Sequence, residues 1–255
     1  MNQHDKALLL AELHKPSDPI ILFNIWDPGS AKAVTDAGAK AIATGSWSVA
    51  AAYGYADGQA LPLDLAIDNI RRIVESVDVP VTLDFEGGYA ESPEELKANI
   101  ARVIEAGAVG INFEDQIVGG EGLYPIEQQS KRIRAIRDAA DEAGIPLFIN
   151  ARTDVFLKTL PGPHTQEHVD EALARAEAYA EAGASGLFAP GLRDVDLIRD
   201  LCRRSPLPVN ILVMPGTPSN SETAAVGVAR ISYGPGPYRK MIEWLKTEAA
   251  GALTI

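Results

Sequence analysis

The sequence predicts an α/β protein that folds as a single (β/α)8 TIM barrel. Short apolar runs rich in β-branched residues alternate with longer amphipathic segments along the whole chain of 255 residues. Four amphipathic segments end in related motifs, DAGAK, EAGAV, EAGIP and EAGAS, whose Gly suits the left-handed C-terminal cap of a helix. No linker divides the chain, and barrels of about 250 residues commonly form one domain. We therefore predict one domain over residues 1–255.

The order of elements begins with a helix from Asp5 to about Leu13, before the first strand. The eight strand candidates are uniformly apolar, so both faces of each are expected to be buried, as in a parallel sheet that helices cover. They are residues 20–24, 41–45, 81–85, 110–114, 147–151, 186–190, 209–213 and 229–233. The helices expected after them are residues 28–37, 63–76, 93–106, 127–143, 167–182, 195–204, 219–226 and 238–249. This strict alternation favours a closed barrel over an open sheet.

The charge balance limits the partners of the chain. A formal net charge of −12 and a pI near 4.8 argue against nucleic acid and against an anionic membrane surface. An acidic protein that binds an acidic substrate needs a local cation. The single cysteine, Cys202, allows no disulfide within the chain and is expected to be a structural thiol. The N-terminus lacks a secretory signal pattern, and we expect a cytoplasmic protein.

Polar residues gather where the predicted strands end. In a barrel this is the catalytic edge, because the loops that follow the strands converge there. The second strand is followed by TGSW at 44–47 and a longer loop that reaches Asp57. The other strands contribute Asn24, Trp26, Asp27, Asp84, Glu86, Asn112, Glu114, Asp115, Asn150, Arg152, Asp154 and Asn210.

Four of these acids predict a metal site. Asp84 and Glu86 are two residues apart, so their side chains share one face of a strand, and Glu114 ends the next strand. Carboxylates crowded at one mouth repel each other unless a cation lies among them, and Asp57 adds a fourth. Hard oxygen ligands suit Mg2+ or Mn2+. Zinc is disfavoured because no two of the four histidines share one predicted helix: His164 precedes the helix in which His168 lies. One acid alone would be interpreted as a helix cap.

Small residues at the same edge predict an anion site. Gly45, Ser46 and Trp47 offer consecutive backbone N–H groups and a hydroxyl to a carboxylate. The Gly-rich segments at 215–219 and 233–238 also follow strands, but their prolines remove N–H donors, so we interpret them first as turns.

Five segments carry a resemblance to a known family: FNIWDPGSAKAVTDAGAKAIATGSWSVAAAYGYADG, VPVTLDFEGGYA, AGAVGINFEDQ, INARTDVFL and EALARAEAYAEAGASGLFAPG. In these, the chain resembles the isocitrate lyase/phosphoenolpyruvate mutase superfamily over nearly its full length. The resemblance implies a barrel that binds Mg2+ and a 2-oxo acid and works through a pyruvate-like enolate. It also implies a homo-oligomer, a tetramer or a dimer, although the C-terminus looks short for the last helix that relatives exchange between subunits.

The resemblance assigns roles residue by residue. Asp84 matches the direct metal carboxylate, whereas Asp57, Glu86 and Glu114 match acids that hold the metal mostly through water. Glu86 replaces a more usual Asp. The substrate-binding residues implied are Gly45, Ser46, Trp47, Asp84, Arg152 and Asn210, and those implied in catalysis are Arg152, Glu114 and Asp57.

The chain also departs from its relatives. The lyases carry a Lys-Lys-Cys-Gly-His type motif in a gating loop, and the mutases have a Lys and an Asn in theirs. Here the segment 116–129, QIVGGEGLYPIEQQ, has neither Lys nor Cys. Ala189 and Pro190 stand where several members have a His. These departures disfavour isocitrate or methylisocitrate cleavage in the usual manner.

The leading hypothesis is a metal-dependent C–C lyase on a small 2-oxo acid, for example an oxaloacetate decarboxylase. Decarboxylation needs an electron sink but no acid on the loop. The alternatives are a phosphoenolpyruvate phosphonomutase or phosphonopyruvate hydrolase, and an inactive binder of 2-oxo acids. A Schiff-base aldolase is disfavoured because Lys40 and Lys158 lie outside the expected strands.

Overall fold

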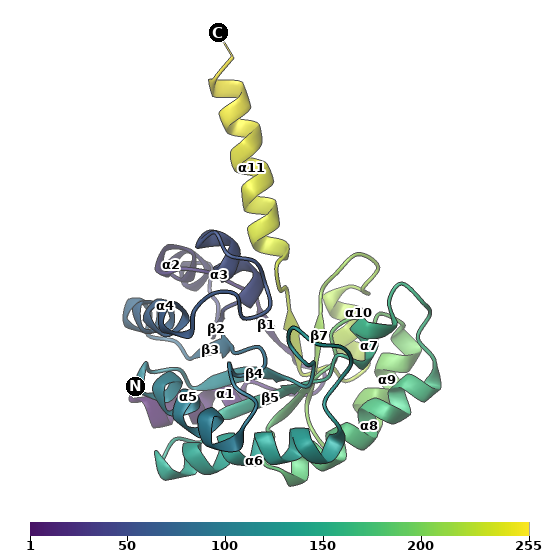
Figure 1. Cartoon of the computed structure of the whole chain (residues 1–255). Helices are drawn as coiled ribbons and strands as arrows, with labels where there is room; N and C mark the ends of the chain where they lie inside the picture. Colours follow the sequence, from purple (N-terminus) through teal and green to yellow (C-terminus); the bar gives the residue numbers. More distant parts are fainter. Residues whose placement is uncertain (255) are drawn as a thin grey trace.

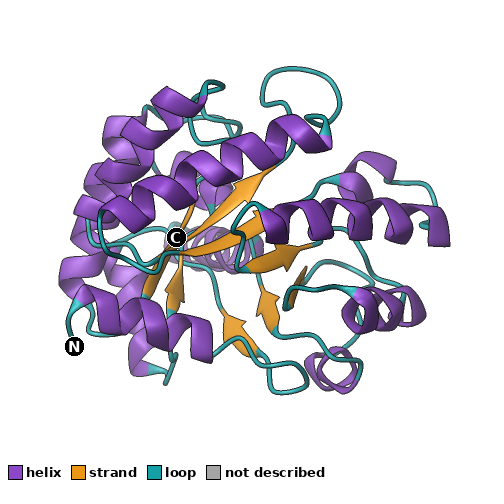
Figure 2. Ribbon diagram, turned by 90° about the horizontal axis from the view of Figure 1, so that it is seen from below, coloured by secondary structure: helices purple, strands orange, loops and turns teal. Residues whose placement is uncertain are grey.

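The computed structural model describes residues 1–254 and forms a nearly closed barrel of eight parallel strands with helices around it (Figures 1 and 2). The predicted fold class is confirmed. Neighbouring strands follow the order β1-β8-β7-β6-β5-β4-β3-β2. Their bounds are β1 Ile20–Leu22, β2 Ile42–Ala43, β3 Val81–Asp84, β4 Gly110–Glu114, β5 Phe148–Arg152, β6 Gly186–Phe188, β7 Val209–Leu212 and β8 Arg230–Ser232. Of the predicted domain, Ile255 lies outside the described residues.

The first and last strands of this order are joined just beyond their ends. Ile25 and Thr44 form an isolated parallel bridge, in which the Ile25 N–H donates to the Ala43 carbonyl at 2.9 Å. Asn24 adds a side-chain link, because its Nδ2 donates to the Thr44 carbonyl at 2.8 Å. Its Oδ1 accepts from the Gly234 N–H at 2.7 Å. One side chain thus ties the segments after β1, β2 and β8 together at the mouth of the barrel.

The helices have the order that the sequence predicts, with two additions. The expected ones are α1 Gln3–Glu12, α2 Pro28–Asp36, α4 Leu63–Ser76, α5 Pro93–Glu105, α6 Ile126–Glu142, α8 Gln166–Glu181, α9 Val195–Arg204, α10 Asn220–Ala225 and α11 Gly236–Ala252. The additions are α3 Ser46–Ala52 and α7 Val155–Thr159. The long loop expected before Asp57 is therefore partly helical. Its Ala-rich stretch favours a helix, and the buried Val49 and Ala50 pack against Leu61 and Ala66.

The core has the layout of a barrel wall. The largest buried cluster joins β2 to β5 with α4, α5 and α6, and a second joins β6 to β8 with α8 and α9. Strands β2 to β8 are thus buried against their covering helices, as the uniform apolar runs predict. The same prediction is wrong for β1, because Ile21 is 44% exposed on the outer face. None of the helices within residues 1–254 has the length and apolarity needed to cross a membrane.

The C-terminal helix lies apart from the barrel. Figure 1 shows α11 rising from the mouth, and its Trp244 and Leu245 are 61% and 51% exposed. On the outer wall of the barrel, Ile21 and Phe23 are also exposed and line a groove of about 620 Å3 between β1 and α2. Two apolar surfaces, one on the helix and one on the wall, are therefore left uncovered by this chain.

Candidate active site at the mouth of the barrel

A cavity of about 210 Å3 opens where the strands end. Its polar lining comes from segments far apart in the chain, which the parallel barrel brings to one edge. The lining includes Asn24, Gly45, Ser46, Trp47, Asp57, Asp84, Asn112, Arg152, Ser232 and Arg239. The larger groove outside the barrel is mostly apolar and has no comparable set of polar side chains, so we assign the chemistry to the mouth.

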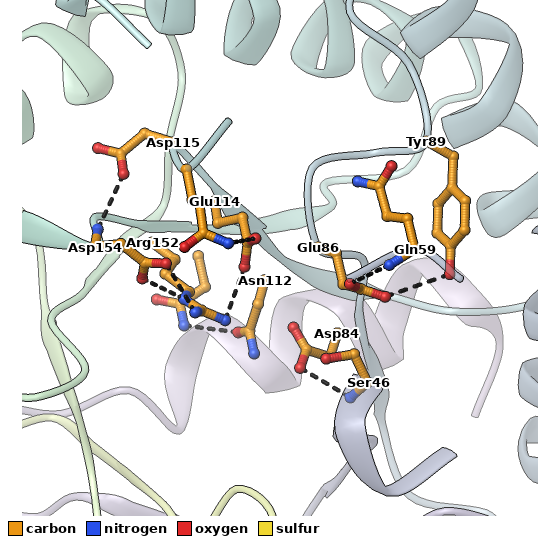
Figure 3. Close-up of polar contacts among 12 residues, drawn as sticks. Ser46, Gln59, Asp84, Glu86, Tyr89, Asn112, Glu114, Asp115, Arg152 and Asp154 are labelled. Atoms are coloured by element: carbon orange, nitrogen blue, oxygen red, sulfur yellow. Dashed lines mark hydrogen bonds and ion pairs between the residues drawn. The ribbon is translucent and has the colours of Figure 1, made fainter. Parts of the chain in front are cut away.

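Asp84 lies at the centre of the site, at the end of β3 (Figure 3). Its Oδ2 accepts a hydrogen bond from the Ser46 N–H at 3.0 Å, at the start of α3. Its Oδ1 is buried and has no hydrogen-bond partner among the described residues. A buried carboxylate oxygen without a partner is costly unless a ligand or cation satisfies it. Two N–H groups of the expected Gly45-Ser46-Trp47 cradle are therefore already used, because the Gly45 N–H donates to the Ile25 carbonyl at 3.2 Å.

Glu86 follows Asp84 on a strained loop. The φ angles of Glu86 and Tyr89 are 49° and 56°, in the left-handed region that few non-glycine residues adopt. Glu86 Oε2 accepts from the Gln59 N–H at 2.8 Å, and its Oε1 lies 3.5 Å from the Tyr89 hydroxyl (Figure 3). The conformation points the Glu86 carboxylate toward Gln59 and Tyr89.

Two side chains from helices hold this loop in place. Arg132 of α6 donates to the Gly87 and Ala90 carbonyls at 2.6 and 3.0 Å. Asn99 of α5 donates to the Gly88 and Tyr89 carbonyls at 3.0 and 3.3 Å. Four successive carbonyls are thus fixed by side chains, and this network can sustain the strained backbone.

The acids of the site raise each other's pKa. Burial, followed by the nearby charges of Asp84 and Asp57, raises the pKa of Glu86 to about 7. Asp57 is exposed on the rim, yet partial desolvation of its carboxylate and the charge of Asp84 raise its pKa. A divalent cation among these groups would relieve both effects.

Arg152, at the end of β5, is held by two carboxylates. Its Nη1 lies 2.8 Å from Glu114 Oε2, and it binds Asp154 through Nε at 2.6 Å and Nη2 at 2.9 Å (Figure 3). Burial alone would lower the pKa of the guanidinium, but the charges of Glu114 and Asp154 outweigh it and raise the pKa. Burial raises the pKa of Glu114, and Arg152 opposes this rise.

Asp115 is fully buried and supports Asp154, which in turn holds Arg152. Its Oδ1 accepts from the Asp154 N–H at 3.0 Å, and its Oδ2 accepts from Arg175 at 3.1 Å and from the Tyr179 hydroxyl at 2.9 Å. These contacts fix the backbone of Asp154 and therefore the carboxylate that orients Arg152. The sequence places Asp115 and Asp154 at the mouth but gives no sign of this supporting role.

Aromatic residues form one wall of the mouth. Tyr238 packs edge-on against Trp26 and Trp47, with ring centroids 4.9 and 5.9 Å apart. The Arg239 guanidinium lies over the Trp47 ring at 4.5 Å. Arg239 also lines the cavity. The sequence pattern does not predict it, because Arg239 lies on α11 and not at a strand end.

The contacts of the acids at the mouth determine which divalent metal they can hold. No group of three or more His, Cys, Asp or Glu within residues 1–254 is placed closely enough to hold a metal by protein ligands alone. Mg2+ needs fewer, since it usually keeps several waters and takes one or two carboxylates. The unpartnered Asp84 Oδ1 offers one such ligand, with Asp57 and Glu86 beside it. The residues fit a hydrated Mg2+.

The structure brings most of the predicted site residues together. Asp57, Asp84 and Arg152 line the cavity with the segment Gly45 to Trp47. Glu86 and Glu114 are buried beside it. Asn210 lies deeper, where its Oδ1 accepts from the Ser232 hydroxyl at 3.1 Å, and Ser232 is the one that lines the cavity.

Comparisons with known proteins agree with this layout. A model of the phosphoenolpyruvate phosphomutase family matches residues 10–253. An uncharacterized protein of Mycobacterium tuberculosis (strain ATCC 25618 / H37Rv) is 32% identical over 229 residues, covering 89% of this chain and 82% of the relative. The 2-methylisocitrate lyase of Escherichia coli (strain K12) is 29% identical over 251 residues, covering 94% and 82%. A solved structure from Burkholderia cenocepacia J2315, provisionally named a phosphonomutase, has a TM-score of 0.96 at 47% identity and covers 98% of this chain and 100% of that one.

Relatives with other names match as well. The phosphoenolpyruvate phosphomutase of Streptomyces hygroscopicus is 28% identical over 85% of this chain and 70% of its own. Oxaloacetate decarboxylase 2 of Pseudomonas fluorescens (strain Pf0-1) is 25% identical over 95% and 82%. A phosphonopyruvate hydrolase solved with oxalate and Mg2+ has a TM-score of 0.82 at 22% identity and covers 98% of this chain and 86% of that one, a likeness of fold. One barrel thus serves several named activities among these relatives.

Proposed function

The chain belongs to the phosphoenolpyruvate phosphomutase family, and from this premise we propose that it is a Mg2+-dependent C–C bond lyase that acts on a small 2-oxo acid. Decarboxylation of oxaloacetate or a close analogue is the form that the site supports best. The observation that carries the proposal is the pairing, in one cavity of about 210 Å3, of the unpartnered Asp84 Oδ1 with the Arg152 guanidinium. This pairing suits a small anion bound between a cation held by Asp84 and a fixed positive charge.

The acids of the site would share the coordination of the metal according to their positions. Asp84 would hold Mg2+, or Mn2+, directly, and Asp57, Glu86 and Glu114 would orient its waters. When bound, the metal supplies a Lewis acid next to the keto group of the substrate. The Ser46 hydroxyl and the Trp47 N–H would meet the substrate carboxylate, since the Gly45 and Ser46 N–H groups already have acceptors.

Arg152 would stabilise the negative charge that develops on the keto oxygen as the C–C bond breaks. It can do so without rearrangement, because Glu114 and Asp154 already fix its guanidinium. Preorganised charge of this kind commonly contributes several kcal/mol to catalysis. Trp47, Tyr238 and Arg239 shield the mouth from solvent on one side.

The composition of the β4–α6 segment favours decarboxylation over the usual lyase reaction. Residues 116–125 contain neither Lys nor Cys to donate a proton to a leaving carbanion. Loss of CO2 leaves an enolate that water can protonate, so it places no demand on this loop. Within this loop, Gln116 approaches the acids: its Nε2 lies 3.5 Å from Glu114 Oε1. Its side-chain amide is not a proton donor of the kind that the usual lyase reaction needs.

A reaction at a P–C bond is the second candidate. The specific support is the likeness at 47% identity to a structure provisionally named a phosphonomutase. The same metal, Arg152 and carboxylate cradle would serve phosphonopyruvate. A binder of 2-oxo acids without turnover is the third candidate, since it needs the same residues and no proton donor.

The deciding experiment measures binding first and turnover second. Thermal unfolding with and without Mg2+ and oxalate, which mimics the pyruvate enolate, tests the site. We expect Mg2+ alone to raise the Tm, and oxalate to raise it further only when Mg2+ is present. Incubation with oxaloacetate should then release pyruvate and CO2, whereas phosphonopyruvate would give phosphoenolpyruvate or inorganic phosphate under the second candidate. Binding without any product would indicate the third, and absence of binding contradicts all three.

We further propose that the protein is a homo-oligomer, a dimer or a tetramer. The support is the pair of uncovered apolar surfaces, Trp244 and Leu245 on α11 and the groove with Ile21 and Phe23 on the barrel wall. In a barrel, the helix after β8 normally covers this part of the wall. Here α11 projects away, so a second copy would cover it.

A further inference from the structure

Arg230 is a charged side chain inside the barrel. It begins β8, is 0% exposed, and forms no salt bridge to any of the residues 1–254. Burying an unpaired guanidinium is costly, and buried arginines are normally paired. The titratable groups that influence it are Asp84 toward the mouth and His14 toward the base. Burial lowers the pKa of His14 to about 3, so this histidine is neutral and the charge of Arg230 is not repelled by it.

The Arg230 guanidinium touches the floor of the cavity. Its Nη2 donates to Asn112 Oδ1 at 3.1 Å, and its Nε donates to Ser232 Oγ at 3.1 Å. Its Nη1 has no hydrogen-bond partner in the described part of the chain. Asn112 and Ser232 both line the cavity, so Arg230 lies one side chain below any ligand there.

Because arginine can only donate, it fixes how Asn112 is turned. The atom of Asn112 that faces Arg230 must be its oxygen, and the same oxygen accepts from Asn150 Nδ2 at 2.9 Å. The amide nitrogen of Asn112 is then the atom left for the cavity. Register places Asn112 beside Asp84, so this donor points into the region where an anion would lie next to Asp84 (Figure 3). Ser232 is oriented similarly, since it accepts from Arg230 and donates to Asn210.

The charge of the mouth gives Arg230 a second role. Arg152 is shared between Glu114 and Asp154, so its charge is already balanced by two carboxylates. Asp57, Asp84 and Glu86 add negative charge around the cavity. An anionic substrate therefore meets an acidic surface. Among residues 1–254, two arginines beside the cavity have no salt bridge: the exposed Arg239 in its lining and the buried Arg230 below its floor. Burial lowers the pKa of Arg230 to about 9, which leaves it charged at neutral pH.

We propose that Arg230 is a positioning residue of the substrate site, which turns the Asn112 amide toward the cavity and supplies a buried positive charge that helps to retain an anionic 2-oxo acid. This inference rests on the proposed function. It adds a group that never touches the substrate and acts through Asn112 and Ser232.

Two binding constants with opposite expected signs test the proposal. Titration calorimetry would measure Mg2+ alone, and then oxalate in saturating Mg2+, for the wild type and for Arg230→Met. The variant removes a positive charge below both ligands. Because that charge attracts the anion and repels the cation, its loss should raise the Kd of oxalate about tenfold and lower the Kd of Mg2+. A merely structural role would weaken both ligands together. Arg230→Lys keeps the positive charge, so it should bind oxalate more tightly than Arg230→Met does and less tightly than the wild type does.

The controls separate the possible failures. Arg137→Met removes a largely buried guanidinium that donates to the Leu147 carbonyl, far from the cavity, and should change neither constant. If Arg230→Met does not fold, Asn112→Asp replaces it as the test. The new carboxylate pairs with Arg230 and removes the amide donor of Asn112. This variant should also weaken oxalate binding and tighten Mg2+ binding. If oxalate binding is unchanged, or both ligands weaken in parallel, the inference is overturned alone. If the wild type binds neither ligand, the proposed function is overturned with it.

Discussion

Arg152 and Glu114 form an ion pair of 2.8 Å at the ends of two adjacent strands, in direct register across the β4–β5 pair. Asp154, two residues further on, holds the same guanidinium through two hydrogen bonds. The barrel thus fixes a cation at its mouth in a geometry that needs a planar, forked side chain.

Replacing Arg152 with Lys should therefore lower kcat/KM for the 2-oxo acid by about 100-fold or more. A lysine keeps the charge but cannot contact Glu114 and both oxygens of Asp154 at once. Steady-state kinetics on oxaloacetate would measure the loss. Arg193→Lys serves as the control, because Arg193 is bound only to the Pro215 carbonyl on the surface. Near-wild-type activity in Arg152→Lys would mean that its charge alone matters.

Asp84→Ala should abolish stabilisation by Mg2+. The mutation removes the unpartnered oxygen that would bind the metal and the acceptor of the Ser46 N–H. The Tm values with and without saturating Mg2+ should then coincide. Cys202→Ala is the matched control, since this half-buried residue lies on α9 and lines no part of the mouth cavity, and the variant should keep both metal response and activity. Lost activity in this control, with the fold retained, would place the catalytic acid elsewhere.

Stability without metal should fall as pH rises from about 4.5 to 7. The pKa of Glu86 is raised from 4.5 to about 7 in the folded protein, so the folded state binds more protons than the unfolded state in this window. The stabilisation from protonated Glu86 is present below pH 4.5 and is lost as pH passes through 7. Asp57, whose pKa is also raised, acts in the same direction.

Glu86→Gln should flatten this pH dependence, because glutamine cannot ionise. Urea unfolding at several pH values would measure it. Mg2+ should reverse the trend in the wild type, since the ion favours the ionised carboxylate. A slope in Glu86→Gln equal to that of the wild type would show that other groups cause the effect.

Arg132→Met should destabilise the fold by about 2–3 kcal/mol and weaken Mg2+ binding. The mutation removes the donors to the Gly87 and Ala90 carbonyls, which hold Glu86 in its strained conformation. It also removes the contact with the Tyr124 ring at 4.1 Å. Denaturant unfolding and calorimetry would measure the two effects. Arg134→Met, an exposed arginine on the same helix, should have little effect on metal binding.

Sequence patterns predict the fold more completely than they predict the site. Buried parallel strands need apolar residues on both faces, and their helices need caps, so both leave strong local signals. The carboxylates of Asp84 and Glu114 are also predicted, because several acids crowded at one edge of a barrel need a cation among them. Arg230 was missed, since its role depends on Asn112 from another strand and on the absence of an ion pair across the barrel. The helix α3 was missed because its alanines lack a clear amphipathic period. Contacts between distant segments leave no local signal.

The uncovered surfaces of α11 and the barrel wall predict the assembly. Trp244→Glu and Phe23→Glu each place a charge on one of the two surfaces, and both should shift the protein to a smaller species. Burying either glutamate against an apolar partner would cost several kcal/mol, more than a contact of one helix can offset. Light scattering coupled to size exclusion would measure the mass. Leu8→Glu adds the same charge to an exposed apolar position on α1 outside the groove, so it should leave the mass unchanged. An oligomer that survives both Trp244→Glu and Phe23→Glu must use another face, and the apolar surface of α11 would then need a different partner.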